Sequence, residues 1–96
     1  MDDFMSTLWA VLEERKENPR PGSYTNSLLD GGTDAMARKV GEEAIEVILA
    51  AKGEGTQRLV AESADLIYHL MVLLLAHDVS WAQVVAELST RAPKRR

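Results

Sequence analysis

The chain has 96 residues, enough for one small domain, and a domain of this size buries a smaller share of its surface than a larger one does. The 15 acidic residues outnumber the 11 basic ones, which gives a formal net charge of −4 and no overall basic field, so nucleic acid is not an expected partner. The sequence contains no cysteine, which excludes disulfides, zinc–thiolate sites and thiol nucleophiles.

The N-terminal part of the chain predicts one helix followed by a long loop. Apolar side chains recur at helical spacing over residues 4–17, and the pattern stops before Pro19. The next stretch, "NPRPGSYTNSLLDGG" over residues 18–32, concentrates proline, glycine, serine and asparagine. We therefore expect a loop here, and loops of this length often hold ligands.

Three further helices are expected after this loop. The second covers about residues 34–52 and ends at a pair of glycines, and the third covers about residues 56–77. Ser80 with Gln83 three places later has the form of a capping box, which opens a fourth helix near residues 81–91.

These patterns predict an all-α fold, a helical bundle of about four helices that dimerisation completes. Residues 1–91 are expected to form a single domain and residues 92–96 a basic tail outside it. The most apolar run, residues 66–76, is shorter than the roughly 20 residues that a bilayer requires, so no membrane partner is expected. The first residues do not have the form of a secretory signal, and a cytoplasmic location is the expectation.

Acidic side chains form a narrow stripe on each of the two central helices. At about 100° per residue, Glu43 and Glu46 share a face of the second helix, as Glu62 and Asp65 do on the third. Two helices that are otherwise largely apolar and joined by a short turn should pack antiparallel as a hairpin. Their carboxylates would then supply the oxygen ligands that a hard divalent cation prefers, and the cation would offset the cost of placing charge among apolar side chains.

A solvated acidic face is the competing interpretation. Glu-x-x-Glu spacing is common on helix surfaces, and Lys39 can support Glu43 at the i,i+4 spacing, so spacing alone leaves both interpretations open. A bound ion is expected to be Mg²⁺, or Mn²⁺, because Asp65 stands where a histidine would complete the di-iron signature Glu-x-x-His. His69 follows Asp65 at i,i+4 and is expected to orient it from the core.

The excess of carboxylates over the charge of one divalent ion suggests a substrate that carries its own ion, as polyphosphates do. Basic side chains could meet phosphate oxygens, and hydroxyls of the loop could bind phosphate or ribose, although turn formation is the simpler role for the hydroxyls. The candidate substrate-binding residues are Arg15, Lys16, Ser23, Tyr24, Thr25 and Lys39.

Residues 15–52, followed by "ESADLIYHLMVLL" over residues 62–74, resemble the phosphoribosyl-ATP pyrophosphatases of histidine biosynthesis. The pattern Glu-Glu-x-x-Glu followed at a distance by Glu-x-x-Asp is that of the wider all-α, MazG-like nucleotide pyrophosphohydrolases. The Ser-Tyr-Thr, Lys-Val-Gly-Glu-Glu and Tyr-His motifs narrow the likeness to the former group.

The resemblance implies Mg²⁺-dependent hydrolysis of phosphoribosyl-ATP to phosphoribosyl-AMP and pyrophosphate, the second step of histidine biosynthesis, by a homodimer or higher oligomer. It implies Glu43, Glu46, Glu62 and Asp65 as metal ligands. Glu42 is implied as a ligand of a second ion or as the base that activates water, so that Glu42 and Glu46 are the predicted catalytic residues.

Two rival functions remain open. A MazG-like house-cleaning hydrolase of ordinary or damaged nucleoside triphosphates would share the acidic residues but would not require the Ser-Tyr-Thr loop. A non-catalytic helical dimerisation module would keep its acidic stripes solvated, and Mg²⁺ would not change its melting temperature.

Overall fold

The structure, a computed structural model, describes residues 4–91, and these form α-helices and one short π-helical turn without a β-strand. The all-α prediction is therefore confirmed for the described part of the chain, while the basic tail predicted for residues 92–96 lies outside it. The elements in chain order are α1 (Phe4–Glu17), α2 (Tyr24–Asp30), α3 (Gly32–Leu49), the π-helical turn η1 (Ala50–Glu54), α4 (Thr56–Ala76) and α5 (Trp81–Arg91).

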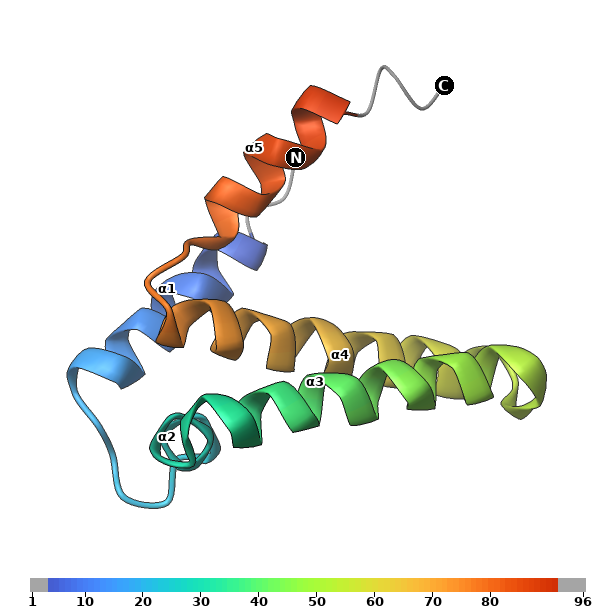
Figure 1. Cartoon of the computed structure of the whole chain (residues 1–96), viewed down its shortest axis with the longest axis horizontal. Helices are drawn as coiled ribbons and strands as arrows, with labels where there is room; N and C mark the ends of the chain where they lie inside the picture. The colour runs from blue at the N-terminus through green and yellow to red at the C-terminus, as the bar shows by residue number, and fades with distance from the viewer. Residues whose placement is uncertain (1–3, 92–96) are drawn as a thin grey trace.

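The two longest helices, α3 and α4, lie side by side and run antiparallel (Figure 1). Their connection is the widened turn η1 and Gly55, whose φ of 94° lies in the left-handed region that glycine adopts at little cost. The predicted helical hairpin is confirmed. Its first helix begins at Gly32 instead of about residue 34, and its α-helical part ends at Leu49, where η1 takes over.

The prediction of a loop over residues 18–32 is wrong in part, because α2 lies inside that segment. The hydroxyl of Ser23 accepts a hydrogen bond of 3.2 Å from the backbone N–H of Asn26, which caps the start of α2. Gly31 follows the helix directly and α3 begins at the next residue, so α2 and α3 meet at a sharp corner (Figure 1). Turn-forming residues at both ends of a seven-residue helix explain why its composition resembles that of a loop.

The hydrophobic core lies at the end of the hairpin where α1 and α2 pack against α4. Helices α1, α2, α3 and α4 all contribute to it. Its buried members are Trp9, Leu12, Leu28, Met36, Met71, Val72 and Leu75.

The other half of the hairpin has little cover, and five of its large apolar side chains are between 39% and 65% exposed. They are Ile45, Ile48, Leu49, Val60 and Ile67. The sequence predicts burial of these side chains with help from a second copy of the chain, and a single chain leaves them on its surface.

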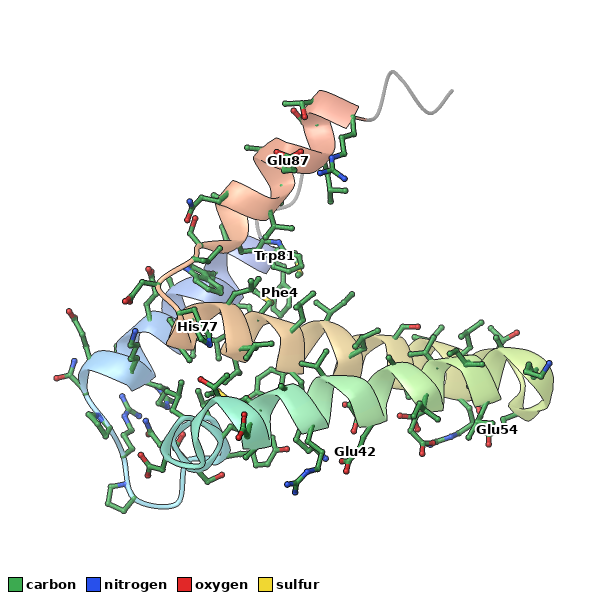
Figure 2. All side chains as sticks on the ribbon, in the orientation of Figure 1. Phe4, Glu42, Glu54, His77, Trp81 and Glu87 are labelled. Carbon is green, nitrogen blue, oxygen red and sulfur yellow. The ribbon has the colours of Figure 1, made fainter. Side chains whose placement is uncertain are left out.

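Helix α5 leaves the body of the molecule on the side away from α2 (Figure 1). The predicted capping box at its start is confirmed: the Ser80 backbone N–H donates to Oε1 of Gln83 at 2.8 Å, and the Gln83 N–H donates to Oγ of Ser80 at 3.1 Å. Trp81 packs against the core where α5 contacts α1, and in the view of Figure 2 its label lies beside that of Phe4. None of the residues of α5 is fully buried.

Helix α4 is long and apolar enough, by length and composition, to cross a membrane, with a mean hydropathy of 1.7 over 18 residues. The central helix of a helical bundle meets the same criteria. In this chain α4 packs along α3 and carries Glu62 and His69 as buried polar residues, so its apolar character serves the core.

Candidate active site

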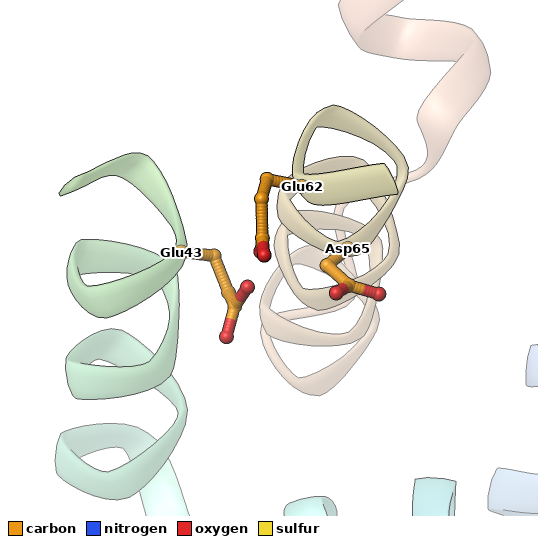
Figure 3. A group of neighbouring side chains, drawn as sticks. All are labelled: Glu43, Glu62 and Asp65. Atoms are coloured by element: carbon orange, nitrogen blue, oxygen red, sulfur yellow. The ribbon is translucent and has the colours of Figure 1, made fainter. Parts of the chain in front are cut away.

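Three carboxylates from the two helices of the hairpin come together. Glu43 projects from α3 toward α4, where Glu62 and Asp65 stand one helical turn apart (Figure 3). One oxygen from each of the three lies within 4.8 Å of the others. Glu62 is only 6% exposed, Glu43 is half-buried and Asp65 is exposed. The group is therefore buried on the side of Glu62 and accessible to solvent on the side of Asp65. We call these three residues the acidic cluster.

The donor set of the acidic cluster fits a hard divalent cation. All three potential ligands are carboxylate oxygens, which Mg²⁺ and Mn²⁺ prefer, and the helices that carry them are long and packed together. Mg²⁺–oxygen distances of about 2.1 Å allow two ligands of one ion to be at most about 4.2 Å apart. The separations of up to 4.8 Å are only slightly larger, so small side-chain adjustments would suffice.

The other two predicted acidic residues of α3 lie outside the acidic cluster. Glu46 is half-buried one turn beyond Glu43, and the group of three does not include it. Glu42 is exposed and projects from α3 on the side away from α4 in the view of Figure 2. The structure thus brings together Glu43, Glu62 and Asp65, three of the four predicted metal ligands.

Each of the two more buried carboxylates has a basic partner four residues earlier on its own helix. Lys39 Nζ lies 3.5 Å from Oε2 of Glu43 and 3.8 Å from Oε1 of Glu42, while the guanidinium of Arg58 pairs with Oε2 of Glu62. Partial desolvation lowers the pKa of Lys39, but Tyr24, Glu43 and Glu42 together outweigh it, and the net direction is upward. Lys39 is therefore held in its charged form beside the acidic cluster.

Hydrogen bonds tie the start of α2 to the middle of α4. The hydroxyl of Tyr24 lies 2.8 Å from Nε2 of His69, and Thr25 Oγ1 lies 2.5 Å from the hydroxyl of Tyr68. The rings of Tyr24 and Tyr68 stack with centroids 6.1 Å apart. Two hydroxyls that the sequence predicts to bind substrate therefore also anchor α2 to the helix of Glu62.

The contacts of His69 differ from the predicted one. Its Nδ1 lies 2.7 Å from the backbone carbonyl oxygen of Asp65, not from the carboxylate that it was expected to orient. Because a carbonyl oxygen only accepts, Nδ1 carries the hydrogen in the neutral ring, and Nε2 accepts from the hydroxyl of Tyr24. His69 thereby links α2 to the turn of α4 that carries Asp65.

A surface groove of about 410 Å³ runs beside this contact. It brings together four of the candidate substrate-binding residues from α1, the following loop and α2. Those four are Arg15, Ser23, Tyr24 and Thr25, and Arg20 and Tyr68 also line it. Tyr24 lines this groove and contacts His69, which in turn bonds the backbone of Asp65, so the groove lies beside the turn of α4 that carries part of the acidic cluster.

Lys16 lies apart from this groove. Its ammonium donates to the carbonyl oxygen of Leu75 at 3.0 Å and to Oδ1 of Asp78 at 2.8 Å, so it caps the C-terminal end of α4. A larger depression of about 690 Å³ is lined by Lys16, Trp9 and Asp78, but none of the acidic cluster lines it. The groove beside Tyr24 is therefore the better placed of the two for chemistry at the carboxylates.

Two further residues shape the site, and only the second of them has a signal in the sequence. Asn26 is buried, and its side chain donates to the carbonyl of Arg15 at 2.8 Å and accepts from the N–H of Arg20 at 2.9 Å. Nothing distinguishes it from the turn-forming residues around it. Arg58 precedes Glu62 at the i,i+4 spacing, and this spacing is the signal that could have identified it.

Comparison with known proteins finds relatives over nearly the whole chain. The chain is 46% identical over 92 residues to the phosphoribosyl-ATP pyrophosphatase of Ignicoccus hospitalis, covering 96% of this chain and 90% of the relative. It is 49% identical over 90 residues to the protein of that name from Listeria welshimeri, covering 94% and 86%. A histidine biosynthesis bifunctional protein, HisIE, of Parasynechococcus marenigrum is 42% identical over 95 residues, and the chain spans only 43% of its length.

A protein-family model also matches nearly the whole chain. The sequence model described as phosphoribosyl-ATP pyrophosphohydrolase matches residues 5–92. This range contains the acidic cluster, the groove beside Tyr24 and the contacts between α2 and α4. The chain belongs to the phosphoribosyl-ATP pyrophosphohydrolase family.

Proposed function

We propose that the protein hydrolyses phosphoribosyl-ATP to phosphoribosyl-AMP and pyrophosphate, the second step of histidine biosynthesis, with Mg²⁺ or Mn²⁺ as cofactor. The observation that carries the proposal is the meeting of Glu43, Glu62 and Asp65 across the hairpin. A bound divalent ion would polarise the phosphates and make an attacking water more acidic. Family membership supports the choice of substrate, and the meeting of the three carboxylates supports the choice of the acidic cluster as the metal site.

Acidic residues of α3 and α4 are assigned to metal binding and to activation of the water. Glu43, Glu62 and Asp65 would hold the ion, and Glu46, one turn from Glu43, would be a further ligand after a change of its side-chain rotamer. Glu42 points away from α4 but shares the ammonium of Lys39 with Glu43, and after a change of its side-chain rotamer it would take a proton from the water as general base.

Phosphate recognition falls to basic and hydroxyl groups around the groove. Lys39 is held charged beside the acidic cluster and neutralises charge that develops on the phosphates. Arg15 lines the groove with Ser23, whose hydroxyl can donate to a phosphate oxygen, and with Tyr24, whose oxygen can accept from a ribose hydroxyl while it donates to His69.

We further propose that the active form is a cytoplasmic homodimer. The exposed apolar half of the hairpin, which includes Ile45, Ile48 and Val60, supports this assembly because a second copy would cover it. A domain of this size buries only a limited share of its apolar surface by itself, and association with a second copy would bury more of it.

The test is to incubate the purified chain with phosphoribosyl-ATP, ATP and dUTP in parallel, with Mg²⁺, and to measure the pyrophosphate released. Release from phosphoribosyl-ATP well above the other two supports the proposal. Preference for ATP or dUTP would favour a house-cleaning hydrolase, and no release from any of the three would leave only a binding or dimerisation role.

A matched pair of variants links the activity to the acidic cluster. Asp65→Asn removes the charge of one proposed ligand, and we expect turnover to fall by about 100-fold or more. Asp34→Asn removes an exposed carboxylate from the first turn of α3, away from the acidic cluster, and should keep turnover near that of the unchanged chain. Turnover retained by both variants would contradict the proposed site.

A further inference from the structure

The ion pair between Arg58 and Glu62 stands at an unfavourable place in α4. Arg58 is in the first turn of the helix, where the exposed backbone N–H groups disfavour a positive charge. No side chain caps this helix start. Local helix electrostatics therefore do not explain why a guanidinium lies here.

The order of the two residues in the sequence is also unfavourable for the stability of the helix. An acid four residues before a base stabilises a helix better than the reverse order. Glu87 and Arg91 on α5 follow the favourable order, with a contact of 2.7 Å. Arg58 precedes Glu62, and Lys39 precedes Glu43, so both pairs of the hairpin have the less favourable order.

Burial of the acids provides the reason for both pairs. The side chain of Glu62 is 8% exposed and that of Glu43 is 13% exposed, and a buried carboxylate needs a positive partner. The basic side chains are themselves accessible, at 55% for Arg58 and 36% for Lys39. Each can therefore leave its carboxylate for solvent without crossing packed protein.

We propose that Arg58 is a displaceable counter-cation of the acidic cluster: it neutralises Glu62 when no divalent ion is bound and leaves that carboxylate when an ion binds. The proposal rests on the proposed function, because it presupposes a divalent ion at the acidic cluster. The released guanidinium stays within one helical turn of Glu62, where it can pair with a phosphate oxygen of the substrate.

The proposal makes a thermodynamic prediction of definite sign. Arg58 and a divalent ion repel each other at the same carboxylate, so removing the guanidinium should tighten ion binding while it destabilises the ion-free protein. An arginine that instead only held Glu62 in a binding geometry would give the opposite sign, with weaker ion binding after its removal.

The experiment is calorimetric titration of the full-length chain with Mg²⁺, combined with thermal melting in EDTA and in saturating Mg²⁺. We expect Arg58→Gln to bind Mg²⁺ about threefold or more tightly than the unchanged chain. Its melting temperature should be lower than that of the unchanged chain in EDTA, and this deficit should shrink or vanish in Mg²⁺. Arg58→Lys keeps the charge and should restore the original affinity.

Arg91→Gln is the matched control, because it breaks an i,i+4 pair on α5 that is remote from the acidic cluster, and its Mg²⁺ affinity should not change. Unchanged or weaker Mg²⁺ binding by Arg58→Gln would overturn the role of Arg58 and leave the proposed function intact. Absence of Mg²⁺ binding by the unchanged chain would overturn the role of Arg58, while the pyrophosphate release from phosphoribosyl-ATP decides the proposed function separately. The melting curve in EDTA shows in each case whether the variant is folded.

Discussion

At the scale of single residues, Lys16 shows how a charged side chain can have a role that its type does not reveal. The sequence makes it a candidate for phosphate binding, and the structure places it at the end of α4 against Leu75 and Asp78. Asp78 has a φ of 58°, a left-handed conformation that is uncommon for residues other than glycine, at the point where the chain leaves α4. Lys16 thereby joins α1 to this turn.

This contact predicts a defined pH dependence of stability. The hydrogen bond and charge of Lys16 hold the pKa of Asp78 below its ordinary value of 3.8. A carboxyl group with a lowered folded pKa contributes stability above its unfolded pKa, and the contribution is lost as the pH falls through the folded pKa. Asp78→Asn should therefore lower the melting temperature at pH 7 and reduce its fall between about pH 5 and pH 2. The same acid sensitivity in both proteins would contradict a role for this contact.

The hydroxyl of Tyr24 gives a second prediction at this scale. Tyr24→Phe keeps the stacked ring but leaves Nε2 of His69 without its partner, and we expect a loss of about 1 kcal/mol in the free energy of unfolding. Urea unfolding at a fixed protein concentration measures it. Phe4→Leu, at a residue that is 59% exposed, provides a comparison with little expected effect. Equal stability of Tyr24→Phe and the unchanged chain would show that this contact does not anchor α2.

At the scale of elements, the sequence predicts the long helices well and the short one poorly. Helices α1, α3, α4 and α5 have apolar residues at helical spacing over three or more turns, and a capping box marks the start of α5. Helix α2 has seven residues, and contacts with α4 and with the end of α1 stabilise it more than its local sequence does. Such tertiary contacts leave no periodic pattern in the sequence.

Asn26 tests this account of α2. Its side chain joins the carbonyl of Arg15 to the N–H of Arg20 and is buried, so Asn26→Ala should cost about 2 kcal/mol of stability and loosen the wall of the groove. We expect a higher KM for phosphoribosyl-ATP with a smaller change in kcat. Asn18→Ala, which removes an exposed hydrogen bond to Glu14, is the control and should change neither value much. Unchanged stability and KM in Asn26→Ala would contradict the role of these contacts.

Residue spacing predicts part of the candidate site, namely which acids can meet, but not the side-chain rotamers that decide which of them do. Pairs of acids one turn apart on two adjacent helices predict that Glu43, Glu62 and Asp65 can meet, and they do. Spacing cannot fix rotamers, and Glu46 stands outside the group although its position on the helix is equivalent in pattern.

At the scale of the whole molecule, the distribution of apolar surface favours association. One end of the hairpin is buried by α1 and α2, and the other exposes Ile45, Ile48 and Val60. In a small domain, such an exposed apolar surface on the hairpin of α3 and α4 is a suitable interface for a second copy of the chain.

The prediction at this scale concerns Ile48, which is 56% exposed in the single chain. If the chain were a monomer, Ile48→Asp would cost little stability, because the side chain already faces water. In the proposed dimer the charge would be buried at the interface, and we expect the variant to dissociate at concentrations where the unchanged chain is dimeric. Sedimentation velocity over a concentration series measures this. A monomeric unchanged chain would contradict the dimer.

The central claim is that acids from two antiparallel helices bind one divalent ion between them. Its most direct test is a crystal structure grown with Mn²⁺, whose anomalous scattering identifies the ion. We expect an anomalous peak within about 2.3 Å of oxygens from Glu43, Glu62 and Asp65. A well-ordered structure in which these side chains diverge and no peak lies among them would contradict the claim.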